Sequence, residues 1–370
     1  MARSLCCFFA LLVMTHSRAS EFLSIPLDSD LFEFDYETLI MSDFTYTDGL
    51  YRQDDAASYF EPRRMELELG FEYTRRFSVK LELEYDYDDR DFGVKDAFVD
   101  LDLPNRYRLK IGRQKQVFGI SRSSSSKNLL TIERPVSNDL LQLDRTTGIL
   151  FEKSIGDTTL QVGVFRREDD GNNIDSSLVR ALYEPEIGEN KYWHMGLTLA
   201  SEAYDGAQYR IKSKGSADVI GSFLKSEKVD AEKVNYFGLD TAWRNGRFSL
   251  IGEYLRNRVI VSGENDLEYD GGYLQASWFL TNDRHRFRDG RFRGVRPSSN
   301  YALEIVTTYS MLDTYEFGKG FEVENLSVGL NYYHSADVKL MAEFNLSKVG
   351  KGKLEEQSGR AVLLRLQLEF

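Results

Sequence analysis

Residues 65–88 read "MELELGFEYTRRFSVKLELEYDYD", and two segments within them alternate strictly between apolar and polar residues. In the first, every second residue from Met65 to Tyr73 is apolar, and glutamates occupy most of the positions between. The second segment starts at Phe77 and repeats the pattern after the polar turn 74–76. Because a period of two sends successive side chains to opposite faces of a strand, the stretch predicts a β-hairpin with one apolar and one wet face.

The same alternation returns along the whole chain, which has only 6 prolines. It is visible in "AFVDLDL", "YRLKIG", "TLQVGVF", "WHMGLTLA", "YLQASWFL", "NYALEIVTTY", "NLSVGLNYYH", "VKLMAEFNLS" and "AVLLRLQLEF". Alternating segments of roughly 10 residues with aromatic ends are typical of transmembrane β-barrels, whose sheet closes so that no edge stays unpaired in lipid. We therefore predict an all-β fold, a transmembrane antiparallel barrel of about 16 strands at about 20 to 22 residues per strand and loop.

The N-terminus predicts export. Residues 1–19 combine Arg3, an apolar run from Leu5 to Met14 and a small residue at Ala19, which is the layout of a removable signal peptide. Its removal would leave residues 20–370 as a single barrel domain without cysteine, and would take the formal charge from −12 to −14. An acidic chain of this kind argues against a nucleic-acid partner. Together with the last strand, "LRLQLEF", the signal predicts the outer membrane of a Gram-negative bacterium.

The alternation stops at residues 112–135, "GRQKQVFGISRSSSSKNLLTIERP". Four basic residues and five serines crowd between Gly112 and Lys127. Hydroxyls donate hydrogen bonds, and Lys and Arg supply positive charge, so the stretch suits an anion in a water-filled lumen. A flexible loop of four serines is the alternative interpretation.

Four blocks of the sequence resemble the phosphate-selective porin O and P family. They are "KDAFVDLDLPNRYRLKIGRQKQVFGISRSSSSKNLLTIERP", "RTTGILFEKSIGDTTLQVGVF", "GGYLQASWFLTNDRHRFRDGRFRGVRP" and "NLSVGLNYYHSADVKLMAEFNLS". The resemblance implies a 16-stranded barrel, commonly a homotrimer, whose third loop folds inward and narrows the pore. The stretch 112–135 falls at that loop. The resemblance also implies a constriction that binds phosphate, made here of Arg63, Arg64, Asp96, Ser124, Ser125, Lys127 and Arg134.

Two further basic segments allow more than one interpretation. "YRIKSK" places Arg210, Lys212 and Lys214 on one face of a strand, which resembles the basic ladder along the family's pore; a solvated outer loop is the alternative. Residues 284–296 hold six arginines, which suit either an external loop binding lipopolysaccharide phosphates or a funnel for anions.

The carboxylates on the wet face of residues 65–88 oppose an anion preference, since rings of carboxylate favour cations. They would matter less if they pair with arginines across the lumen. No nucleophile constellation suggests an enzyme, because His334 and Ser335 are adjacent in an extended segment and face opposite sides. No motif indicates a cofactor or a metal site.

We therefore expect a passive outer-membrane channel for small anions, with phosphate or polyphosphate as first candidates. A general diffusion porin with weak preference is the alternative, and a plugged adhesin or receptor is a third. The partners of the anion channel would be these anions, membrane lipid and lipopolysaccharide. We expect anion preference to fall in Lys127→Glu and Arg134→Glu.

Overall fold

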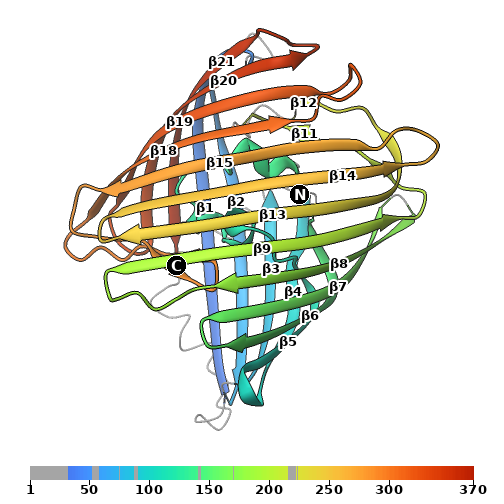
Figure 1. The fold of residues 1–370 in the computed structure, drawn as a ribbon. Coiled ribbons are helices and arrows are strands. Elements are labelled where there is room, and N and C mark those ends of the chain that lie inside the picture. The colour runs from blue at the N-terminus through green and yellow to red at the C-terminus, as the bar shows by residue number, and fades with distance from the viewer. Residues whose placement is uncertain are drawn as a thin grey trace.

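The computed structural model of the protein describes residues 32–51, 58–74, 76–86, 91–140, 143–169, 171–215, 222 and 224–370. The predicted signal peptide, residues 1–19, lies outside them. Sixteen long antiparallel strands form one closed barrel (Figure 1). They are β1 (Phe32–Gly49), β2 (Ser58–Tyr73), β3 (Phe77–Asp86), β4 (Asp91–Leu103), β5 (Tyr107–Lys115), β6 (Arg145–Ile155), β7 (Thr158–Asp169), β8 (Asn172–Tyr183), β9 (Lys191–Tyr204), β13 (Val229–Asn245), β14 (Phe248–Val261), β15 (Leu267–Phe279), β18 (Ala302–Asp313), β19 (Phe321–Tyr333), β20 (Val338–Gly352) and β21 (Ser358–Glu369).

The barrel closes where the first strand meets the last. β1 pairs with β21 from Leu39 opposite Glu369 to Gly49 opposite Gly359. The hairpin predicted from residues 65–88 is present, with β2 and β3 in register from Arg64 opposite Asp86 to Tyr73 opposite Phe77. The predicted fold class and strand number are confirmed.

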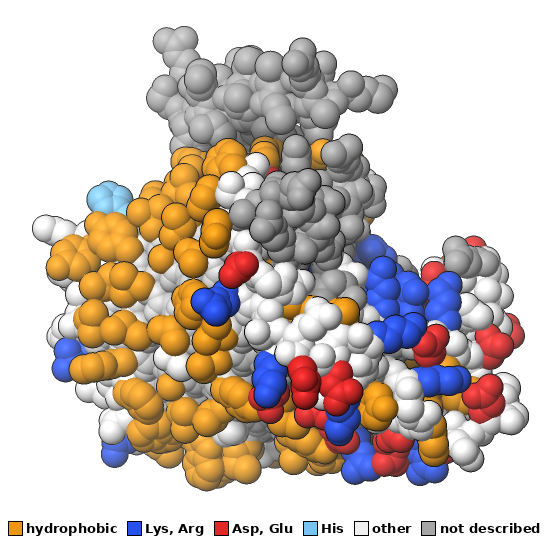
Figure 2. Space-filling view, turned by 90° about the horizontal axis from the view of Figure 1, so that it is seen from above, with side chains coloured by type: hydrophobic (Ala, Val, Ile, Leu, Met, Phe, Trp, Pro, Cys, Tyr) orange, Lys and Arg blue, Asp and Glu red, His pale blue; other side chains and the backbone are white. Residues whose placement is uncertain are grey.

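The two faces of the wall follow the alternation. In β20, Leu340, Phe344 and Leu346 are exposed on the outside, whereas Glu343 and Asn345 point inward and are buried. Figure 2 shows apolar side chains gathered over much of one face of the molecule, with charged side chains toward one edge. Such an outer surface matches lipid, whereas the polar inner face matches a lumen. Within the described residues, no helix has the length and apolar character needed to cross a bilayer.

The two ends of the barrel differ. At the turn end, where β2, β4 and β6 finish, the connections to the next strand are short. At the opposite, loop end, residues 116–144 connect β5 to β6 and residues 205–228 connect β9 to β13. The segment 205–228 contains the two-residue strands β10 (Gln208–Tyr209), β11 (Lys212–Ser213) and β12 (Leu224–Lys225).

The constriction loop, residues 116–144, folds into the barrel, as predicted. It contains α3 (Ile120–Ser123) and the short 3-10 helices η2 (Ser126–Asn128) and η3 (Val136–Leu140). The apolar side chains that the structure describes in this loop are almost fully buried, and its backbone bonds to the opposite wall. Glu343 accepts a hydrogen bond from the Ile132 N–H at 2.8 Å, and Asn331 and Asn257 donate to carbonyls of the loop. Buried backbone groups need such partners, so the wall fixes the path of the loop.

A second segment enters the lumen from the turn end. Residues 280–301 form the inward hairpin, with strands β16 (Arg286–Arg288) and β17 (Arg291–Arg293). Phe292 is buried and belongs to the same apolar cluster as Ile120 and Leu130 of the constriction loop. The arginine-rich segment therefore does not project as an external loop. The reason is that Phe287 and Phe292, which lie opposite each other in the hairpin, pack their rings together against this cluster, whereas arginines flank both rings.

Candidate functional site

The pore contains two basins separated by the constriction loop. The outer basin lies toward the loop end, has a volume of about 260 Å³, and is lined by six basic and two acidic side chains. Its lining consists of Arg63, Arg64, Arg122, Glu133, Arg134, Asn138, Asp139, Lys212, Lys214 and Ser222. The formal surplus is therefore four positive charges. Because a narrow basin between low-dielectric walls is screened less than an open surface, this surplus attracts anions.

The inner basin has a volume of about 300 Å³ and is lined by the wall, the constriction loop and the inward hairpin. Seven basic side chains face five acidic ones, a formal surplus of two positive charges. The charged lining consists of Glu37, Glu66, Glu68, Lys80, Glu82, Asp96, Lys110, Lys115, Lys127, Arg145, Arg291 and Arg293.

The predicted constriction residues divide between the basins instead of forming one cluster. Arg63, Arg64 and Arg134 line the outer basin, whereas Asp96, Ser125 and Lys127 line the inner one, and Ser124 lines neither. The sequence analysis did not single out Arg122 and Lys115, whereas Arg291 and Arg293 of the inner basin belong to the segment for which it allowed a funnel for anions.

Ser124 is a structural residue of the loop. Its side chain is 0% exposed; the hydroxyl donates to the Ile120 carbonyl at 2.7 Å and accepts from the Phe292 N–H at 3.0 Å. Its hydroxyl therefore ties the constriction loop to the inward hairpin instead of facing the pore, while Ser123 and Ser125 on either side line the inner basin. The run of serines carries no period that distinguishes these orientations.

The basic residues of the constriction are held by carboxylates or carbonyls. Arg63 pairs with Asp86 at 2.9 Å and with Glu133 at 3.5 Å. Arg134 donates to the carbonyls of Ser121 and Ser124, both at 3.1 Å. These bonds fix the two guanidinium groups at the outer basin.

Lys127 and Asp96 also have partners. The Lys127 ammonium pairs with Glu37 and, at 3.3 Å, with Glu369, so it bridges the first and last strands of the barrel. Burial lowers the pKa of Lys127, but Glu369 and Glu37 outweigh this and raise it. Asp96 accepts from the Arg145 guanidinium at 2.8 Å. Both side chains contribute less net charge than their residue types suggest.

The lumen-facing carboxylates of β2 and β3 are largely neutralised. Lys95 of β4 pairs with Glu66, with Glu82 at 2.9 Å and with Glu84 at 2.7 Å. Arg64 adds an ion pair with Glu84 at 3.3 Å. The carboxylates are therefore paired within one wall, mainly by Lys95, and not by arginines across the lumen. This pairing removes much of the preference for cations that the carboxylates alone would give.

The residues of the predicted ladder share one face. Arg210 and Lys212 line a hollow of about 800 Å³ at the mouth, and Lys212 and Lys214 line the outer basin. Tyr209 and Ile211 between them are buried, so the segment is tucked into the barrel and is not a solvated outer loop. Lys212 belongs to both hollows, and no acidic side chain of the described residues forms an ion pair with it.

Two acidic groups of the constriction loop differ in charge. Burial raises the pKa of Glu133, but Arg365 and Arg63 outweigh it and bring the value to about 2. Burial raises the pKa of Asp139 to about 7, against a hydrogen bond from Ser213 and the charge of Lys214. Glu133 is therefore a permanent counter-charge to the arginines, whereas Asp139 gains its proton near neutral pH.

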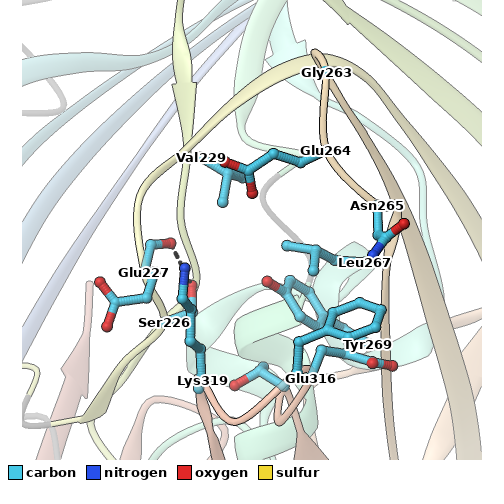
Figure 3. A pocket seen from close by; sticks show the side chains of 13 residues that line it. Ser226, Glu227, Val229, Gly263, Glu264, Asn265, Leu267, Tyr269, Glu316 and Lys319 are labelled. Atoms are coloured by element: carbon cyan, nitrogen blue, oxygen red, sulfur yellow. Dashed lines mark hydrogen bonds between the residues drawn. The ribbon is translucent and has the colours of Figure 1, made fainter.

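A separate hollow of about 530 Å³ lies among the loops 226–229, 263–269 and 314–320 (Figure 3). Glu227, Glu264 and Glu316 reach it along with a single ammonium, that of Lys319. Its acidic balance sets it apart from the basic path through the pore. Among the described residues, no cluster of three or more His, Cys, Asp or Glu side chains is placed to hold a metal ion.

A closed sixteen-stranded barrel with an apolar outer wall, a polar lumen and an inward loop defines a porin of the outer membrane. The sequence matches the family model of the phosphate-selective porin O and P over residues 34–370, and the chain belongs to this family. The predictions of an outer-membrane location and of an anion channel are confirmed at the level of the family.

Individual relatives agree with this assignment. Porin O of Pseudomonas aeruginosa is 23% identical over 400 residues, which cover 94% of this chain and 91% of that protein. The fold is similar to that of the anion-selective porin from Comamonas acidovorans, with a TM-score of 0.60. It is also similar to that of the trimer form of OmpT from Vibrio cholerae, with a TM-score of 0.59. These two structures are 12% and 10% identical, and each alignment covers 92% of this chain and 100% of the other.

Proposed function

We propose that this porin passes small anions by passive diffusion, and that phosphate or polyphosphate is the preferred solute. The observation that carries the proposal is the outer basin, where six basic side chains face two acidic ones. An anion coming from the loop end meets Arg210, then Lys212, before it reaches Arg64 and Arg134.

The chemistry of this lining suits an oxyanion with several oxygens. Guanidinium groups donate paired hydrogen bonds to phosphate, and an ammonium adds a compact charge. Asp139 faces the same basin and, with its raised pKa near 7, accepts a hydrogen bond from a protonated oxyanion when it is ionised and donates one to the oxyanion when it is protonated. A second set of cations in the inner basin, including Arg291 and Arg293, offers the next position beyond the loop.

A general diffusion porin with weak preference is the second candidate. The five carboxylates of the inner basin favour it, because they reduce the net charge that a permeating ion meets there. The predicted homotrimer, the contact with lipopolysaccharide and the removal of residues 1–19 also belong to the proposal. The trimer is supported by the fold that this chain shares with an outer membrane protein described in a trimer form.

The test is conductance of single channels in a planar bilayer, with phosphate titrated into constant chloride. A site that binds and releases anions saturates, so phosphate should reduce the chloride current along a saturating curve. A current that stays unchanged at every phosphate concentration would favour the general diffusion porin.

A further inference from the structure

A chain of four side chains, of which Arg180, Asp240 and His194 are buried and Glu184 is partly exposed, joins the constriction loop to the inward hairpin. Arg180 of β8 donates to the Gly119 carbonyl at 3.1 Å and to the Ser123 hydroxyl at 2.9 Å, both in the constriction loop. The same guanidinium pairs with Asp240 of β13 at 3.0 Å. Arg180 is 1% exposed, so this ion pair is out of contact with water and its geometry is well defined.

The chain continues through a histidine to the hairpin. His194 of β9 is 0% exposed and lies 2.6 Å from Asp240 through Nε2 and 3.1 Å from Glu184 through Nδ1. Glu184 in turn accepts a hydrogen bond from the Gly290 N–H at 2.8 Å, and Gly290 lies between β16 and β17. The two inward segments, which enter from opposite ends of the barrel, are thus linked through the wall.

The fit at Gly290 is close. Its φ is +63°, and a Cβ built there would lie 2.8 Å from the His194 ring. Glycine is therefore required at this position both by backbone conformation and by space. The hairpin tip rests directly against the imidazole.

The hydrogen bonds define the charge of the histidine. Carboxylates only accept hydrogen bonds when ionised, so an imidazole between two of them must donate from both nitrogens and is an imidazolium. Arg180 and His194 then balance Asp240 and Glu184. If the ring loses one proton, one nitrogen turns a lone pair toward a carboxylate, and that contact becomes repulsive.

Other charged groups surround this cluster. Tyr192 of β9 donates to Glu184, and two charges of the hairpin interact electrostatically with this group, Asp289 with Tyr192 and Arg291 with Arg180. Glu253 of β14 faces Asp240 and accepts from the Ser121 N–H at 2.6 Å. Of the groups named in this cluster, His194 alone has a carboxylate bonded to each of its two ring nitrogens.

We propose that Arg180, Asp240, His194 and Glu184 form a clamp that positions the constriction loop against the inward hairpin, and that the clamp weakens when His194 loses a proton. These four are positioning residues, because they hold the segments that line the two basins. Only the effect of the clamp on the width of the pore rests on the proposed channel function. Docking of the hairpin is measurable without any permeating ion.

The experiment uses trypsin on the folded full-length barrel in detergent, with mass spectrometry of the fragments. The hairpin carries six arginines between residues 284 and 296, so cleavage there reports undocking. At pH 7.5, His194→Ala should raise the cleavage rate in this segment roughly tenfold or more, as expected when charge-assisted hydrogen bonds are lost. The matched control is His334→Ala, which changes a histidine in the exposed turn after β19 and should behave as wild type.

A second variant keeps the test decisive if His194→Ala fails to fold. Gly290→Ala retains all four clamp side chains and displaces the hairpin alone, so it should increase cleavage to a similar extent. Wild-type resistance of both folded variants, or of Gly290→Ala if only it folds, would overturn the clamp.

The dependence on pH is tested by the same cleavage at pH 7.5 and pH 9, with rates divided by those of His194→Gln to remove the response of trypsin itself. The ratio of wild type to His194→Gln should rise with pH. His285→Gln should still show the rise, because His285 pairs with Glu304 at the base of the hairpin and not with the clamp. A constant wild-type ratio, or loss of the rise in His285→Gln, would refute the role of His194 as the titrating group.

Discussion

Reversing the charge of Lys212 tests how strongly the outer basin acts on a permeating anion. Lys212 lines both the mouth and the outer basin, and Lys212→Glu reduces the surplus of four positive charges there to two. A sphere of the basin's volume has a radius of about 4 Å, so we take a charge on its wall to lie about 6 Å from an ion inside.

At this separation in water, one unit charge contributes about 0.7 kcal/mol, and screening at 0.1 M salt reduces it to roughly 0.4 kcal/mol. Reversal counts twice, so anion occupancy should fall roughly three- to fourfold and cation occupancy should rise by the same factor. The anion-to-cation permeability ratio should therefore fall about tenfold in 0.1 M salt, and only about twofold in 1 M salt, where screening is stronger.

The assay is the reversal potential of single channels under a salt gradient, at both ionic strengths. Lys353→Glu is the matched control, because it makes the same charge change on a side chain that is 93% exposed and lines neither basin. Equal losses of selectivity in the two variants, or an unchanged ratio in Lys212→Glu, would show that the outer basin does not set the anion preference.

Three further predictions concern the constriction loop and the junction of the first and last strands. Lys127→Glu places a third carboxylate beside Glu37 and Glu369, where the first and last strands meet. Anion preference should therefore fall, and the folded barrel should unfold at a lower temperature in gel-shift assays, with a smaller effect in Lys127→Gln. Asp139 is neutral below its pKa of about 7, so anion preference should increase as pH falls from 8 to 6, and Asp139→Asn should hold the high value throughout when reversal potentials are compared. Arg365→Ala leaves the buried Asp43 unpaired, which should destabilise the barrel by about 3 to 5 kcal/mol in urea unfolding, whereas a loss below 1 kcal/mol would contradict a structural role for the pair.

The barrel was predictable because period-2 alternation is a local property of each strand. Residues 65–88 alone indicate the hairpin, and its repetition gives the closed sheet. The position of the constriction loop was also predictable, since alternation stops at residues 112–135. The roles of its serines were not predictable, because a loop has no regular period that tells which side chains face the pore. Ser124 is buried, whereas its neighbours Ser123 and Ser125 line the inner basin.

Partners distant in sequence were beyond such reasoning. Lys127 pairs with Glu37, 90 residues away, and this contact exists only because the loop crosses the lumen. The neutralisation of glutamates by Lys95 depends on the register between β3 and β4, and the pattern of one strand does not contain it. The inward hairpin was visible only as a run of arginines, whose position inside the barrel follows from burial of Phe292.

The central claim is that the lumen, in an acidic protein, selects anions. Its most direct test is the zero-current potential of the wild-type channel across a tenfold gradient of potassium chloride in a planar bilayer. If the lumen selects anions, the dilute side becomes negative, toward the limit of about 59 mV for a tenfold ratio of a monovalent ion. A potential near zero would indicate a general diffusion pore, and a positive dilute side would show a lumen that selects cations.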